Sequence, residues 1–204
     1  PSNLLLGEGF NTSAYYNNGP IPAGWTVVDT GSRDGPSEWT IVGNELRQQS
    51  NIRGYRETLS GEGSYLLYDA GGSWTDYRAM ASISSRDDDR IGLMFRVGDD
   101  NNYYRFSWNK SGAYYPAGRE LVKKVGGVYT RLASDAVPYV TTTYSAHHLY
   151  WLEVSVIGSS IEVRVDGELV FSVVDSDLTT GSIAFYSNMN EDAIFDTVVV
   201  ESLE

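Results

Sequence analysis

The chain has 204 residues, no cysteine, and 15 basic against 27 acidic residues, which gives a formal net charge of −12. This charge opposes approach to nucleic acid, the missing thiols exclude disulfides and cysteine-ligated zinc, and no apolar run is long enough for membrane insertion. Hydrophobic residues at 41% and aromatic residues at 13% are typical of a folded, strand-rich domain.

Apolar residues alternate with a period of two along most of the chain, and no helical stripe interrupts them. Residues 7–24 are rich in turn formers, and we expect them to wrap around the domain. Beyond them the pattern predicts nine strands: Ala79–Ser84, Ile91–Val97, Tyr103–Trp108, Leu121–Val125, Tyr150–Ile157, Ile161–Val165, Leu169–Val173, Ser182–Ser187 and Phe195–Glu201. The prediction is an all-β, two-sheet antiparallel jelly-roll sandwich that spans residues 1–204 as a single domain. Its abrupt start at Pro1 suggests excision from a larger multidomain protein.

Two hairpins carry a testable register. Leu152 and Val163 share an inner face if Gly158-Ser159 forms a two-residue turn. In the earlier hairpin, an even loop over residues 99–102 turns the apolar side chains inward.

That loop also places Arg96 opposite Arg105 on the outer face. Directly opposed like charges destabilise a sheet, so this pair requires acidic neighbours or binds something anionic or polyhydroxylated. Both readings stay open at this point.

Three other features are candidates for glycan contact. Arg53 and Tyr55 lie in a polar stretch where a phenol ring stacks on a sugar and a guanidinium reaches hydroxyl or carboxylate groups. Lys123 or Lys124 extends the arginine patch, and Tyr115 lies in a loop that contains glycine. The tryptophans, Trp151 among them, are expected to pack rather than bind. The predicted ligand-binding set is Arg53, Tyr55, Arg96, Tyr103, Arg105, Tyr115 and Lys123.

The run from Trp151-Leu-Glu-Val-Ser-Val to Asp166-Gly, followed by Asp177-Leu-Thr-Thr-Gly-Ser, resembles concanavalin A-like lectin/glucanase domains. Laminin G-like modules and 3-keto-disaccharide hydrolase-like domains carry the same order of elements. The segment Asp87-Asp-Asp-Arg-Ile-Gly and the run after Asn102 also resemble the thrombospondin C-terminal lectin-like domain. The resemblance implies a concanavalin A-like jelly roll whose concave sheet receives saccharide.

The termini resemble the paired edge segments of carbohydrate-binding modules that hold structural calcium. These segments are Gly7-Glu-Gly-Phe-Asn and Phe195-Asp-Thr-Val. By that resemblance Glu8, Asn11 and Asp196 are candidate calcium ligands, because Ca²⁺ binds carboxylate and amide oxygens. The alternative is that they are solvated edge residues.

Catalytic motifs of such jelly rolls are missing from the sequence. The Glu-x-Asp-x-x-Glu run of laminarinase-type hydrolases does not occur. Alginate lyase-type jelly rolls use a Gln-x-His strand, whereas His147 and His148 are adjacent, so at most one faces a given side.

The sequence therefore predicts a secreted or cell-surface, non-catalytic carbohydrate-binding module. Its partners would be a polysaccharide or oligosaccharide, anionic or containing uronic acid, and neighbouring domains of the parent protein. The alternatives are a polysaccharide lyase or keto-sugar hydrolase-like enzyme, and a calcium-dependent adhesion domain that binds protein.

Overall fold

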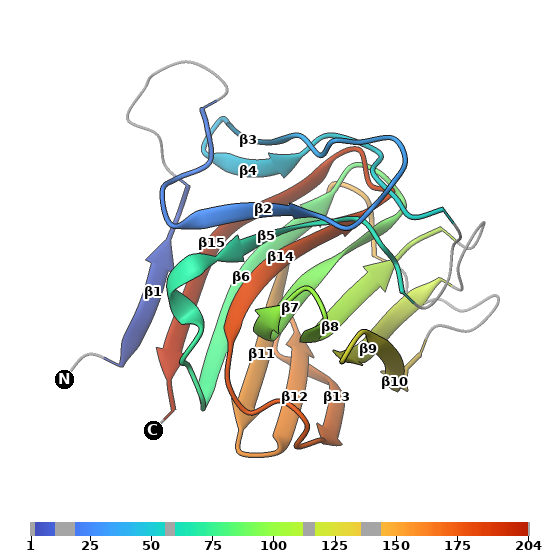
Figure 1. Ribbon diagram of the computed structural model, residues 1–204. Coiled ribbons are helices and arrows are strands. Elements are labelled where there is room, and N and C mark those ends of the chain that lie inside the picture. The colour runs from blue at the N-terminus through green and yellow to red at the C-terminus, as the bar shows by residue number, and fades with distance from the viewer. Residues whose placement is uncertain (1–2, 11–18, 56–59, 112–116, 136–143, 204) are drawn as a thin grey trace.

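Two antiparallel β-sheets pack face to face in the computed structural model, which describes residues 3–10, 19–55, 60–111, 117–135 and 144–203 (Figure 1). Sheet A contains β1 (Leu4–Glu8), β3 (Trp39–Val42), β4 (Glu45–Gln48), β6 (Tyr77–Ser85), β11 (Tyr150–Ile157), β12 (Ser160–Val165), β13 (Glu168–Val174) and β15 (Ala193–Ser202). Sheet B contains β2 (Trp25–Asp29), β5 (Ser64–Tyr68), β7 (Arg90–Asp99), β8 (Asn102–Asn109), β9 (Gly118–Val125), β10 (Val128–Ser134) and β14 (Ser182–Asn188). A 3-10 turn, η1 (Asp69–Gly71), follows β5.

The strand order is β13-β12-β11-β6-β15-β4-β3 in sheet A, where β1 also pairs with β15, and β10-β9-β8-β7-β14-β5-β2 in sheet B. The first and last strands of the chain thus lie side by side in sheet A (Figure 1). The predicted jelly-roll sandwich is confirmed. In the described part of the chain, no helix is long and apolar enough to cross a membrane.

The main core lies between the sheets and follows from the period-two alternation. On β11, Leu152 and Val154 face inward and are fully buried, as is Val163 on β12. Aromatic rings join the two layers: the ring centroids of Phe185 in sheet B and Phe195 in sheet A are 4.7 Å apart. Aromatic rings this close together bury large apolar areas, so this contact helps to hold the two sheets together.

All nine predicted strands are present, extended by one to three residues at several ends. The hairpin of β11 and β12 has the predicted register, with Val154 opposite Val163 and a two-residue turn at Gly158-Ser159. The alternation did not reveal β10 or the short strands that precede β6. Short strands and edge strands carry few alternating positions, so their pattern is weak.

Sheet B has a second buried layer, on its outer face. Alternation turns Tyr104 inward and its neighbour Tyr103 outward, yet both are buried. The outer layer consists of Tyr65, Met94, Val97, Tyr103, Ala184 and Tyr186. Sheet B therefore differs from a sheet of a simple two-layer sandwich, because its outer face is also buried and includes tyrosine side chains with polar hydroxyls.

Candidate binding site on the outer face of sheet B

Arg105 is the centre of the polar groups on this outer face. Its Nη1 donates hydrogen bonds to the carbonyl oxygens of Ser60, at 2.7 Å, and Gly61, at 3.4 Å. Its Cζ lies 4.4 Å from the ring centroid of Tyr186, whose hydroxyl donates to the Gly61 carbonyl at 2.5 Å. Arg105 is 1% exposed and Tyr186 is 2% exposed. The segment before β5 therefore closes over the sheet and is anchored to it by these two side chains.

A chain of ion pairs runs from this buried centre towards solvent. Glu120 Oε2 accepts a hydrogen bond from Arg90 at 3.3 Å, and Glu120 Oε1 forms an ion pair with Arg131 at 2.6 Å. The Arg90 and Glu120 side chains are each 4% exposed, whereas Arg131 is 49% exposed. Burial lowers the pKa of Arg90 below its usual value, although nearby Tyr186 and Glu120 favour its charged form. Arg131 therefore carries the exposed positive charge of this chain of ion pairs, whereas Arg90 is buried and pairs with Glu120 beside Arg105.

Two tyrosines and a lysine continue the same face on β8, β9 and β10. The hydroxyls of Tyr103 and Tyr129 are 2.8 Å apart, and Lys124 Nζ lies 5.7 Å and 5.1 Å from the two ring centroids. Burial is the main cause of the raised pKa of Tyr103, so its phenol stays neutral. We call the whole set the arginine–tyrosine cluster: Arg90, Tyr103, Arg105, Glu120, Lys124, Tyr129, Arg131 and Tyr186.

The predicted opposition of Arg96 and Arg105 is wrong. Met94 is opposite Arg105, because a β-bulge after Phe95 shifts the register of β7, and Arg96 has a positive φ of 46°. The Arg96 side chain leaves the outer face. It donates to the carbonyl oxygens of Gly158 (2.8 Å), Leu178 (3.0 Å) and Thr75 (3.1 Å). Arg96 therefore ties together loops at one end of the sandwich.

Lys123 does not extend the arginine patch either. Leu121 is the core residue of β9, so Lys123 shares its inward side and Lys124 faces outward. Lys123 Nζ pairs with Asp175 at 2.5 Å and Asp177 at 2.6 Å, beyond the end of β13. The sequence left this register open because residues 121 and 122 are both apolar. Of the two lysines, Lys124 belongs to the arginine–tyrosine cluster.

The other predicted ligand residues fall in separate places. Arg53 pairs with Asp34 at 2.7 Å, and the Arg33 guanidinium lies 4.3 Å from the ring centroid of Tyr55, which is 67% exposed. These residues form an exposed group of their own. Tyr115 lies outside the described residues. Of the predicted residues that the structure describes, Tyr103 and Arg105 lie in the arginine–tyrosine cluster.

Arg90, Glu120, Tyr129, Arg131 and Tyr186 were not predicted from the sequence. Their only signal was alternation: each is one position away from an inward-facing residue of its strand. That signal marks the outer face but does not say which strands are neighbours.

The predicted calcium ligands are only partly described. Glu8 Oε1 accepts the main-chain N–H groups of Gly9 and Phe10, and Asp196 Oδ1 accepts that of Thr197. Asn11 lies outside the described residues. Calcium binding by this set stays a prediction.

The chain is similar to several solved structures that bind or process carbohydrates. The carbohydrate-binding module CBM66 from Bacillus subtilis matches with 21% identity and a TM-score of 0.65, over 88% of this chain and 96% of that one. Domain 4 of AbnA, an extracellular arabinanase from Geobacillus stearothermophilus solved with arabinotriose, matches with 15% identity and a TM-score of 0.57, over 98% and 93%. The Ca²⁺-bound VIP36 lumenal domain matches with 12% identity and a TM-score of 0.59, over 89% and 84%. At these identities the likeness establishes the fold.

No protein with a curated description matches the chain. A family model does match, and it covers residues 14–201, nearly the whole sequence. The chain belongs to the family of 3-keto-alpha-glucoside-1,2-lyase-like domains.

Proposed function

We propose that this chain is a non-catalytic carbohydrate-binding module that receives a glycan at the arginine–tyrosine cluster. The observation that carries the proposal is the grouping of guanidinium, ammonium and phenol groups on one sheet face of an acidic protein. Such groups donate hydrogen bonds to hydroxyls, and tyrosine rings stack on the C–H faces of sugars. The fold shared with carbohydrate-binding modules supports this reading.

The accessible edge of the cluster favours an anionic or uronic-acid-containing glycan. Arg131 is half exposed, and Lys124 and Tyr129 are partly exposed beside it. Glu120, the carboxylate among them, already pairs with two arginines. A sugar carboxylate would meet cationic donors here, and bidentate pairing with a guanidinium is the strong form of that contact.

Glu120 also supports the absence of catalysis at this face. One of its carboxylate oxygens accepts a hydrogen bond from Arg90, and the other forms an ion pair with Arg131. A general acid or base must be free to exchange a proton with its substrate, and glycoside hydrolysis uses two such carboxylates around one bond. A carboxylate that is paired with two guanidinium groups stays charged and is poorly placed for that exchange.

The family match favours one competing function, cleavage of a keto-sugar glycoside. Release of product from 3-keto-glucosides by the purified chain, above the rate of a heat-denatured control, would establish the enzyme and contradict the module. We place the module in a secreted or surface-attached parent protein, next to other domains, as is the case for the arabinanase domain with the same fold.

The test is a glycan array that contains neutral and uronic-acid polysaccharides, followed by titration calorimetry of the retained glycan. Arg131→Ala should weaken binding by about tenfold, because it removes a charged donor. Tyr129→Phe should weaken binding by a few-fold, because it removes a hydroxyl. Arg164→Ala is the matched control, because Arg164 is also a partly exposed, ion-paired arginine but lies on β12 of sheet A. Unchanged binding by Arg131→Ala, or no retained glycan at all, contradicts the proposal.

A further inference from the structure

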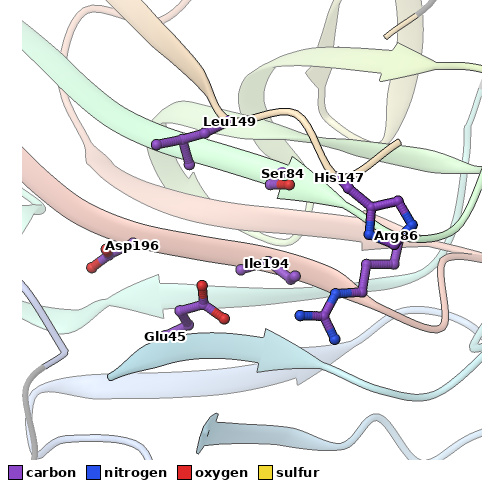
Figure 2. A pocket seen from close by; sticks show the side chains of 7 residues that line it. All are labelled: Glu45, Ser84, Arg86, His147, Leu149, Ile194 and Asp196. Carbon is purple, nitrogen blue, oxygen red and sulfur yellow. The ribbon is translucent and has the colours of Figure 1, made fainter. Parts of the chain in front are cut away.

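The outer face of sheet A, on the opposite side of the sandwich, contains a pocket of about 260 Å³ (Figure 2). Its lining comes from β4, β6 and the residue after it, β15 and the segment before β11: Glu45, Ser84, Arg86, His147, Leu149, Ile194 and Asp196. Figure 2 shows Glu45 and Asp196 towards one end, and Arg86 and His147 towards the other. Of these side chains, Asp196 alone is among the functional residues predicted from the sequence.

The strand register explains why a hollow forms here. Trp151 on β11 is opposite Ser82 on β6, and Ser82 is in turn opposite Asp196 on β15. Neighbouring strands are about 4.8 Å apart, so the indole and the carboxylate stand roughly 10 Å apart with only a small serine between them. Ser84 repeats this arrangement beside Ile194 in the next outward-facing row. Of these two serines, Ser84 lines the pocket, where its small side chain leaves space that a larger one would fill.

One exposed apolar side chain, Leu149, lines the hollow, and Trp151 lies two residues further along the chain, outside the lining. Trp151 was expected to pack, but it is 49% exposed, and Leu149, two residues before it, is 52% exposed. Because alternate residues share a face, both project from the outer side of sheet A. An exposed indole beside a polar hollow is suited to stacking on the C–H face of a sugar ring.

The polar groups of the pocket carry both signs of charge. Glu45 pairs with Arg47 at 2.7 Å, and Arg86 lies 3.6 Å from Asp192. Asp196 has no cationic partner within ion-pair distance among the described residues. Within the same part of the chain, the carboxylates and the imidazole of the pocket do not converge as metal ligands do. The pocket thus offers acceptors at one end and donors at the other.

We propose that this pocket is a second carbohydrate site, which takes a single neutral sugar ring. A sugar hydroxyl both donates and accepts, so it matches Asp196 and Glu45 as well as Arg86. A carboxylated sugar would meet the two carboxylates, and an amine would meet the guanidinium. The volume is below the roughly 300–1,000 Å³ of drug-sized sites, which fits one ring better than an oligosaccharide.

This inference rests on the proposed carbohydrate-binding function and extends it. Two sites on opposite faces let one module contact two glycan chains, or two branches of one chain, at the same time. Weak binding at each site would then combine into higher avidity.

The test is an ¹H–¹⁵N correlation NMR titration of the full chain with methyl glycosides of neutral hexoses and pentoses, in EDTA to remove any bound calcium. We expect shifts at Ser82, Ser84 and Ile194 and at the Trp151 indole N–H. Trp151→Ala and Asp196→Asn should each raise the Kd fitted to these shifts about tenfold. Ile157→Ala is the matched control, since Ile157 is 54% exposed on the same strand.

The outcomes separate the two proposals. Shifts confined to the arginine–tyrosine cluster would overturn the second site and leave the proposed function standing. Shifts at the pocket that persist in both Trp151→Ala and Asp196→Asn would also overturn it. No shifts on either face, together with an empty glycan array, would overturn both.

Discussion

The Arg105 guanidinium covers the Tyr186 ring at 4.4 Å, and both residues donate hydrogen bonds to the carbonyl oxygen of Gly61. This shared acceptor joins the segment before β5 to two strands of sheet B. A cation over an aromatic face is attracted by the ring quadrupole, more strongly when both are buried. The shape of the binding face therefore depends on how closely Gly61 approaches it.

Gly61→Ala should disrupt the arginine–tyrosine cluster. Gly61 has a φ of +49°, and a Cβ there would lie 2.6 Å from both Arg90 Nη1 and the Tyr186 hydroxyl. Gly43→Ala is the matched control, since its φ is +60° and nothing lies within 4 Å of the added Cβ. The control should lose about 1–2 kcal/mol of unfolding free energy through backbone strain alone. We expect Gly61→Ala to lose more and also to lose glycan binding; equal losses in urea unfolding, with binding intact, would contradict this.

Arg96→Ala should destabilise the fold without a direct effect on glycan contacts. The variant removes the charged donor that binds the carbonyl oxygens of Gly158, Leu178 and Thr75 in a partly buried region. A hydrogen bond to a charged group contributes about 1.5–3 kcal/mol, so we expect a loss of about 3 kcal/mol in urea unfolding. A fully stable Arg96→Ala that no longer binds glycan would instead restore the sequence-based role of Arg96 as a ligand.

Acid should weaken the contact between β9 and the segment after β13. Burial would raise the pKa of Asp175, but hydrogen bonds from Lys123 and Tyr104 outweigh it and hold that pKa below its usual value. A carboxyl with a lower pKa in the folded chain contributes stability above its unfolded pKa of about 3.9, and this is lost as pH falls through the folded pKa. The free energy of unfolding measured in urea should therefore change less between pH 7 and pH 3 in Asp175→Asn than in the unmodified chain. The exposed Asp88→Asn serves as the control, and an equal pH dependence in all three proteins would refute the assignment.

Alkaline pH should act on Tyr104 at the same contact. Burial is the main reason that the pKa of Tyr104 is raised to about 12, and the hydrogen bond to Asp175 adds to it. A raised pKa in the folded chain gives stability that is present below the unfolded value of about 10 and is lost as pH rises through 12. Absorbance titration at 295 nm should show one phenol fewer ionising near pH 12 in Tyr104→Phe than in the unmodified chain. Identical titration curves would contradict the prediction.

Calcium should raise the Tm if Glu8, Asn11 and Asp196 hold the ion. A ligand at a hundred times its Kd adds about 2.7 kcal/mol to the stability of the folded state. The Tm should then fall in EDTA, and Glu8→Gln should remove most of the difference. A Tm that is the same with calcium and with EDTA would leave these residues as solvated edge groups.

Local pattern was enough to predict nine of the strands and the inner face of the sandwich. Leu152 and Val163 were identified as core residues and Gly158-Ser159 as a turn, because side chains alternate along a strand whatever its neighbours are. Tyr103 and Arg105 were placed on the outer face of β8 for the same reason.

Only the tertiary structure decided how the strands meet. The bulge at Arg96 depends on carbonyl groups distant in sequence and on Gly181, where a Cβ would lie 2.4 Å from the Arg96 carbonyl carbon. The grouping of Arg90 with Glu120 requires β7 and β9 to flank β8. Trp151 is exposed because no element covers that part of sheet A in the described structure. Alternation fixes a side chain's face, but register, bulges and coverage come from contacts between distant segments, which no local pattern encodes.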